Sequence, residues 1–135
     1  MTLAKGTSAS VLTTVRISDF AAQRELRGDA FINHAFAKEE REQCLARNRP
    51  NDGLAARYAA RASLTRACRE HDVQPPSCAD AAPIVHDARG APHFLFGPTR
   101  SLHSNGRRFE ISVSLAHDGD IACALVLMRE SDDET

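Results

Sequence analysis

The stretch LAARYAARASLTRACREH, from Leu54 to His71, decides the fold. Alanine and leucine dominate it and neither proline nor glycine interrupts it, so it predicts the clearest helix in the chain. One stripe at helical spacing consists of Leu54, Tyr58, Ala62 and Thr65, and it is widened by Ala55, Ala59 and Leu64. Because most of these side chains are small, we expect the helix to pack closely against a neighbouring layer.

The segment before this helix predicts one strand and two shorter helices. Val11 to Ile17 is a β-branched run that is typical of a partly buried strand. A helix is expected to begin after the N-cap residue Ser18 and to end at Gly28. An apolar cluster, a second helix and a turn follow, at residues 31–36, 38–48 and 50–53.

The segment after the long helix predicts mainly strands. A connector at residues 74–83 leads into a hairpin formed by residues 84–86 and 93–96. A helix of one or two turns is expected at residues 99–104 and a tight turn at residues 105–106. Two further strands are expected at residues 110–115 and 121–128. The last strand is almost entirely apolar, so we expect it to be central. This order of elements predicts an α+β fold in which the long helix packs on an antiparallel sheet.

The composition is that of one globular domain. The chain has 135 residues, of which 42% are hydrophobic and 26% charged, enough for one core and too few for two. We expect a flexible N-terminus over residues 1–10, the domain over residues 11–130 and an acidic tail over residues 131–135. The four cysteines match neither a metal-finger nor a disulfide spacing, so we expect reduced thiols and no metal site.

Charge and hydropathy exclude some classes of partner. The chain has 17 basic and 18 acidic residues and a net charge of -1, which argues against a nucleic-acid partner. No stretch has the length and apolarity of a signal peptide or a membrane span. We therefore expect a cytoplasmic protein without a membrane partner.

Five ordered stretches resemble the motifs of one enzyme family. VLTTVRISDF at residues 11–20 takes the place of the family's first strand, and residues 31–40 resemble its F-x-x-R-x-F-S/T-x-x-E element. Residues 55–67 align without a gap with its signature helix, A-x-R-W/F-A-A-K-E-A-x-x-K-A. Residues 90–92 are similar to its G-x-P hairpin, and residues 113–126 to its final V-S-L/I-S/T-H element and the strand that follows. Over nearly its whole length the chain resembles holo-acyl-carrier-protein synthase, the small 4′-phosphopantetheinyl transferase.

The resemblance implies a metal-dependent reaction whose ligands this chain lacks. In that family a carrier-protein serine attacks the β-phosphate of coenzyme A, and a divalent metal neutralises the pyrophosphate charge. Magnesium prefers anionic oxygen ligands, which the family takes from an Asp on the first strand and a Glu on the signature helix. Those positions are Thr13 and Ala62 here. Because Thr13 has one neutral oxygen and Ala62 none, we expect weak or absent magnesium binding and loss of the ordinary transfer.

The resemblance also implies phosphate-binding and catalytic positions that the chain retains. Arg61 and Arg66 stand where the family has two lysines, and they are expected to hold a phosphate of coenzyme A or phosphopantetheine. His117 stands at the place of its pocket histidine and is the candidate general acid or base.

Two kinds of protein partner follow from the resemblance. Family members contact the acidic acyl carrier protein through the helix after the first strand, where this chain has Arg16, Arg24 and Arg27. Family members of this length also form trimers with sites between protomers, so a homotrimer is expected.

Three functions remain open. The first is a divergent family member that binds a carrier protein or a phosphopantetheine-tethered acyl chain in polyketide or fatty-acid metabolism, with or without a repurposed, metal-independent reaction. The second is an active transferase that moves 4′-phosphopantetheine from coenzyme A to a carrier-protein serine. The third is a non-catalytic subunit that regulates an active relative. The absence of both carboxylates favours the first.

Overall fold

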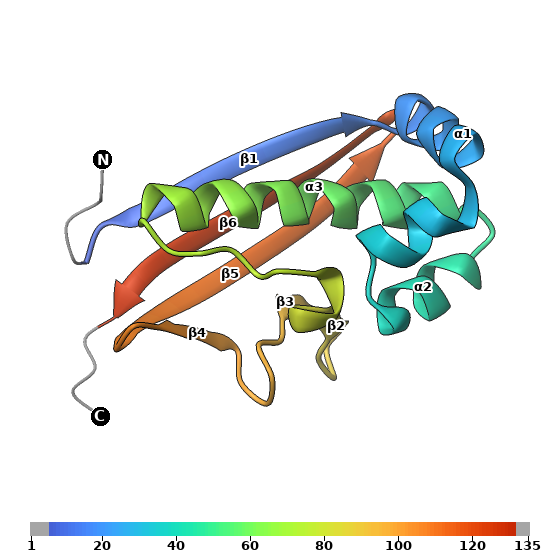
Figure 1. Ribbon diagram of the computed structural model, residues 1–135. Coiled ribbons are helices and arrows are strands. Elements are labelled where there is room, and N and C mark those ends of the chain that lie inside the picture. Colours follow the sequence, from blue (N-terminus) through green and yellow to red (C-terminus); the bar gives the residue numbers. More distant parts are fainter. Residues whose placement is uncertain (1–5, 132–135) are drawn as a thin grey trace.

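A four-stranded antiparallel sheet forms one layer of the molecule, and a long helix lies across it (Figure 1). This computed structural model describes residues 6–131. The helices are α1 (Ile17–Ala35), α2 (Lys38–Leu45), α3 (Pro50–Glu70) and the short 3-10 helix η1 (Ala79–Ala81). The strands are β1 (Ser8–Arg16), β2 (Ile84–His86), β3 (Pro92–Phe94), β4 (Ser101–Ser104), β5 (Arg107–Asp118) and β6 (Ile121–Ser131).

The sheet has the strand order β1-β6-β5-β4, which places β6 inside it as the apolar sequence of this strand predicts. The pairing is antiparallel on both sides of β6, with Thr13 opposite Ala124 and Val113 opposite Val126. β2 and β3 form a separate two-stranded ribbon, which confirms the predicted hairpin. Because side chains alternate along a strand, one face of the sheet turns toward α3 and the other turns away from it.

The main core lies between the sheet and α3. Ala59, Ala60 and Ala67 are fully buried on α3, and their small side chains let the helix backbone approach the sheet closely. The sheet contributes larger apolar side chains, among them Val11, Phe109, Val126 and Met128. Burial of each large apolar side chain contributes about 1.5–3 kcal/mol. The predicted α+β fold with its long helix on an antiparallel sheet is confirmed.

Helix α1 contains a sharp break at the residue where the sequence predicts its end. Gly28 has φ 72° and ψ -160°, a conformation open almost exclusively to glycine, but the helix resumes directly afterwards and continues to Ala35. The second segment carries Phe31, which packs with Phe20 and with Tyr58 of α3. The break therefore folds the end of α1 back onto α3 (Figure 1).

The helix predicted at residues 99–104 is wrong, because this segment contains strand β4. Asn105 and Gly106 both have positive φ, 51° and 76°, and they join Ser104 to its partner Arg107 in a two-residue hairpin turn. Such a turn aligns the chain on its two sides as paired strands. The prediction recognised the turn but did not extend its consequence to the residues before it.

Several boundaries also differ from the predictions: the helix expected at residues 38–48 ends at Leu45, and the strand expected at residues 110–115 spans Arg107–Asp118. The turn expected at residues 50–53 is instead the first turn of α3, with Pro50 at its start, where the missing proline N–H costs no helical hydrogen bond. Strand β1 begins at Ser8, within the stretch expected to be flexible. Residues 1–5 and 132–135, which hold most of the expected flexible ends, lie outside the described residues. None of the helices in the described part of the chain could cross a membrane.

Candidate functional site

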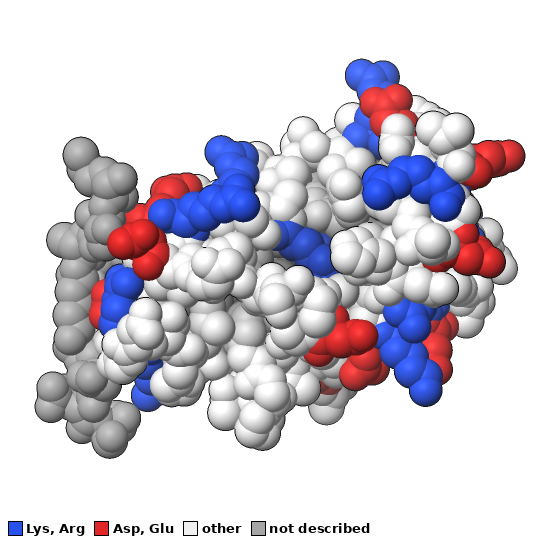
Figure 2. Space-filling model, in the orientation of Figure 1, with Lys and Arg blue, Asp and Glu red and all other residues white. Residues whose placement is uncertain are grey.

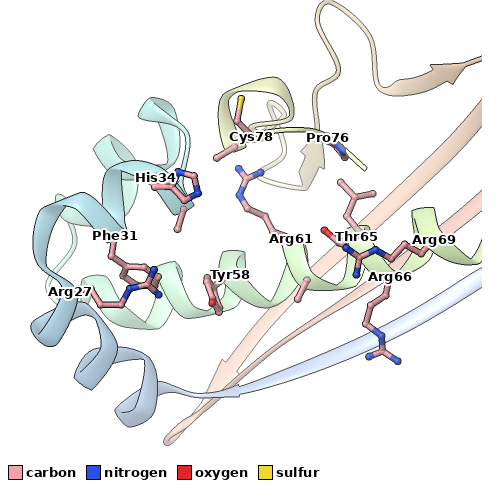
Figure 3. Close-up of a pocket in the computed structure, with 14 residues that line it drawn as sticks. Arg27, Phe31, His34, Tyr58, Arg61, Thr65, Arg66, Arg69, Pro76 and Cys78 are labelled. Atoms are coloured by element: carbon pink, nitrogen blue, oxygen red, sulfur yellow. The ribbon is translucent and has the colours of Figure 1, made fainter. Parts of the chain in front are cut away.

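A cavity of about 500 Å³ lies between α1, α3 and the chain that follows α3. We call it the arginine pocket. Its walls come from α1 on both sides of the break at Gly28, from α3 and from the chain after α3: Arg27, Phe31, His34, Ala35, Tyr58, Arg61, Ala62, Leu64, Thr65, Arg66, Arg69, Pro76, Cys78 and Ala79 (Figure 3). Four of these residues are arginines, and no Asp or Glu of the described chain lines the pocket.

The face of the molecule in Figure 2 carries basic side chains around a hollow, in agreement with the four arginines that line the arginine pocket. Figure 2 shows a basic side chain set deep in a hollow near the middle of the face, with further basic side chains on both sides of it. Several guanidinium groups around one cavity repel each other, and a bound anion relieves that repulsion. Arginine also matches the geometry of a phosphate with two parallel hydrogen bonds. The arginine pocket is therefore suited to a phosphorylated ligand.

Arg61 is the most constrained of the four arginines. Its Nη1 donates to the Ala82 carbonyl at 3.0 Å, and its Nη2 donates to Oε1 of Glu40, with which it forms an ion pair. Glu40 is completely buried, and its Oε1 also accepts the backbone N–H of Ala37 at 2.9 Å. Burial raises the pKa of the Glu40 carboxyl, and the positive charge of Arg61 offsets only part of that rise. Glu40 thus fixes the direction of the Arg61 side chain.

Arg66 and Arg69 occupy different sides of α3. In Figure 3 the Arg61 side chain extends toward Cys78, whereas Arg66 extends in the opposite direction. Arg69 is two four-residue steps along the helix from Arg61, and residues at such spacing share a face. The structure therefore pairs Arg61 with Arg69 more closely than with Arg66. The prediction from sequence missed Arg69, although its spacing from Arg61 was visible.

Arg27 also belongs to the arginine pocket. Its guanidinium lies over the ring of Phe31, 4.5 Å from the centroid, and Phe31 packs against Tyr58 at a centroid distance of 5.9 Å. A cation over an aromatic face is attracted by the ring. Arg27, Phe31 and His34 therefore make α1 one wall of the arginine pocket. The family motifs did not indicate that α1 lines this pocket.

The two positions that the resemblance assigns to metal ligands are connected through Ser63, which contacts Thr13 and directly follows Ala62 in α3. Ala62 lines the arginine pocket. Thr13 faces the sheet side of α3, where its Oγ1 is 2.6 Å from the hydroxyl of buried Ser63. A methyl group and one neutral hydroxyl that already has a partner do not fit a magnesium ion, which needs several oxygen ligands. Across residues 6–131 there is no group of three or more His, Cys, Asp or Glu side chains that could hold a metal ion.

His117 does not line the arginine pocket. It is near the end of β5, exposed, and its Nδ1 is 3.8 Å from Oδ2 of Asp52 in the first turn of α3. Asp52 also pairs with Arg49 at 3.1 Å. Within one protomer, the structure therefore does not bring His117 together with Arg61.

The other two candidate arginines lie near the first segment of α1. Arg16 is exposed, with its Nε 3.9 Å from Asp19. Arg24 donates to the Asn51 side chain at 2.8 Å. Between Arg24 and Arg27, Leu26 leaves 80% of its surface exposed.

Individual relatives, and not a family model, assign the chain to a family. The comparison with family models found no match. The holo-acyl-carrier-protein synthase of Nocardia farcinica is 30% identical over 129 residues, which cover 88% of this chain and 85% of that protein. The enzyme of the same name from Trichlorobacter lovleyi is 30% identical over 119 residues, covering 87% and 94%.

Solved structures agree on the fold. The holo-acyl-carrier-protein synthase from Neisseria meningitidis has a TM-score of 0.69 at 21% identity and covers 89% of this chain and 96% of its own. The Helicobacter pylori protein of this name, solved in complex with coenzyme A, has a TM-score of 0.68 at 14% identity, covering 91% and 100%. From these relatives, and from a fold that carries the family's elements in order, the chain belongs to the holo-acyl-carrier-protein synthase family of phosphopantetheinyl transferases.

Proposed function

We propose that this chain is a divergent family member that binds coenzyme A or a phosphopantetheine-bearing carrier protein through the arginine pocket, without magnesium-dependent transfer. The observation that carries the proposal is that Ala62 stands among four arginines in a cavity without acidic lining. A carboxylate there would hold a cation. Its absence leaves a cavity whose charge suits the phosphate itself.

The arginines supply by direct contact part of the charge neutralisation that a metal supplies in the related enzymes. Arg61 is held in place by Glu40 and Ala82, so less side-chain entropy is lost when it binds a phosphate. Arg69 shares its face of α3, and Arg27 approaches from α1. Direct arginine contacts stabilise a bound phosphate but do not replace the divalent cation that the ordinary transfer would need, so binding is expected to persist after transfer is lost.

An acyl carrier protein is the proposed macromolecular partner. Leu26 is exposed on α1 between Arg24 and Arg27, and Arg16 lies just before the helix. An exposed apolar residue flanked by cations is complementary to an acidic helical surface that carries its own apolar residues. Arg27 would then contribute both to this contact and to the arginine pocket.

A homotrimer is proposed as the working form. The sheet face opposite α3 is not covered by any described helix, and it exposes Leu12, Ile121 and Leu127 by 59%, 44% and 42%. Exposed apolar residues that lie together on one sheet face favour association. In a trimer, His117 of one protomer could serve the arginine pocket of another, as the candidate acid or base of a metal-independent reaction on a tethered acyl group.

Two measurements test the proposal. Isothermal titration calorimetry with 3′,5′-ADP and with coenzyme A is expected to show binding that EDTA does not weaken. Intact-mass analysis of apo-carrier protein incubated with coenzyme A, Mg²⁺ and the protein is expected to show no gain of phosphopantetheine. Binding that disappears with EDTA would contradict the proposal.

An active transferase is the second candidate. It is favoured by the relatives named synthase, which match this chain over most of their own length. Under this alternative the intact-mass experiment shows the phosphopantetheine gain in the presence of Mg²⁺. The result of that experiment therefore separates the two candidates.

A further inference from the structure

A second, smaller cavity adjoins the arginine pocket. It has a volume of about 140 Å³ and is lined by Val15, Asp19, Phe20, Gln23, Phe31 and Tyr58. We call it the aromatic cavity. It shares Phe31 and Tyr58 with the arginine pocket, so the two cavities meet at these rings. One ligand could therefore occupy both, with an anionic part among the arginines and an apolar part among the rings.

Four of the six residues that line the aromatic cavity are apolar or aromatic, and the rings among them are firmly held. Phe20 and Phe31 leave only 3% and 6% of their surfaces exposed. Phe20 packs against Phe31 at 5.8 Å and against Tyr58 at 5.6 Å, measured between ring centroids. Tyr58 is 39% exposed, and its ring forms the surface between the two cavities. A hydrocarbon chain would lose water here without disturbing the packing of the core.

The distance along α3 suits a pantetheine arm. At 1.5 Å per residue, Tyr58 is about 16 Å from Arg69 along the helix axis, which places the phosphate end of the arm at Arg69. The arm contains two amide units and is about as long as four to five residues of extended chain, roughly 15 Å. Ala62 stands between the two ends and lines the arginine pocket. Its methyl group leaves room for the arm to pass.

We propose that the aromatic cavity is a subsite for a short, uncharged acyl group carried on the sulfur of phosphopantetheine. This inference rests on the proposed function, because the arginine pocket must hold the phosphate for the acyl end to reach Tyr58. The volume corresponds to about five methylene groups if each takes about the 30 Å³ of a liquid water molecule. The rings of Phe20 and Phe31 disfavour an acyl group that ends in a carboxylate, because burial of a charge against apolar walls is costly.

The test is calorimetric titration of the full-length protein with coenzyme A and its butyryl, hexanoyl, dodecanoyl and succinyl thioesters. Each buried methylene is expected to lower the dissociation constant about fourfold, and the gain should stop near six carbons. Succinyl-coenzyme A is expected to bind no more tightly than coenzyme A.

Variants at exposed positions of α1 test whether the acyl group binds in the aromatic cavity. Gln23→Phe fills the mouth of the aromatic cavity and is expected to abolish the preference for hexanoyl-coenzyme A over coenzyme A. Glu25→Phe adds the same side chain two residues along, at an exposed position outside both cavities, and is expected to keep the preference. Gln23→Ala, which removes bulk from the wall, should also keep it.

The outcomes separate the inference from the function on which it rests. If coenzyme A binds but the acyl thioesters bind no more tightly, the acyl subsite is disproved and the proposed function stands. The same conclusion follows if Gln23→Phe and Glu25→Phe behave alike. If dodecanoyl-coenzyme A gains over the hexanoyl thioester, the chain lies on an open surface and the subsite is again disproved. If coenzyme A itself does not bind, both proposals fail.

Discussion

At the scale of single residues, the direction of each arginine on α3 determines what it can bind. Arg69 follows Arg61 at two four-residue steps, whereas Arg66 extends to the opposite side of the helix in Figure 3. Arg69→Ala is therefore expected to weaken 3′,5′-ADP binding about tenfold, the loss of one charged hydrogen bond, and Arg66→Ala to weaken it less. Calorimetry at fixed ionic strength measures both. Arg16→Ala, outside the pocket, is the control, and equal losses at residues 66 and 69 would refute the assignment.

Restoring the two carboxylates tests the reason for the expected loss of transfer. Thr13→Asp with Ala62→Glu adds one carboxylate at the residue that contacts Ser63 and one at the residue that precedes it, and the double variant is expected to gain Mg²⁺-dependent transfer of phosphopantetheine to apo-carrier protein. Intact-mass analysis measures the gain. Thr14→Asp with Ala62→Glu is the matched control, because Thr14 is exposed on the other sheet face. Failure of the Thr13 variant would mean that the cleft has changed beyond its metal ligands.

Glu40 gives the protein a pH dependence of defined sign. Burial raises its pKa in the folded state, so the folded protein binds this proton more tightly than the unfolded chain does. The stabilisation is complete below the unfolded pKa, near 4.5, and is lost as the pH rises through the folded pKa. Glu40→Gln keeps a neutral acceptor and removes this titration. In urea unfolding, wild type is expected to lose stability relative to Glu40→Gln as the pH rises above 4.5, and a constant difference would contradict the assignment.

At the scale of elements, the break in α1 positions one wall of both cavities. Gly28 has φ 72° and ψ -160°, and the segment after it carries Phe31 and His34. A side chain at residue 28 has open space around it but an unfavourable backbone conformation. Gly28→Ala is therefore expected to cost about 1–3 kcal/mol in the free energy of unfolding. Urea unfolding measures the loss. Ala30→Ser, at an exposed position of the same segment, should cost no more than about 0.5 kcal/mol, and equal costs would show that the Gly28 conformation carries no strain.

At the scale of the whole molecule, the uncovered sheet face is the surface through which we propose that the protein assembles. Leu127 lies on the interior strand β6, with Ser10 and Ser112 as its neighbours on the flanking strands. Leu127→Glu places a charge in the middle of this face, and burial of an unpaired charge is costly. Sedimentation velocity is expected to show a trimer for wild type and smaller species for the variant. Leu26→Glu, on α1, should leave the trimer intact. A monomeric wild type would disprove the proposed assembly.

Local chemistry explains which elements were predictable. The alanine-rich helix, the apolar strand β6 and the hairpin of β2 and β3 each have a periodicity or turn signal of their own, and all three are confirmed. Strand β4 was not predicted although its turn was, because Ser101–Ser104 has no apolar or β-branched run and its strand state depends on pairing with β5 across the Asn105-Gly106 turn. The continuation of α1 after Gly28 likewise depends on the packing of Phe31 against Phe20 and Tyr58.

The amino-acid sequence by itself determined the fold class, the family motifs and the absence of both metal carboxylates, because each of these is a property of residue type and spacing. Tertiary structure alone decided which cations share a cavity. It placed Arg27 and Arg69 with Arg61, left His117 beside Asp52, and set the aromatic cavity against the arginine pocket. These relations join residues far apart in the chain, and they follow from how α1 folds back onto α3, which no local pattern contains.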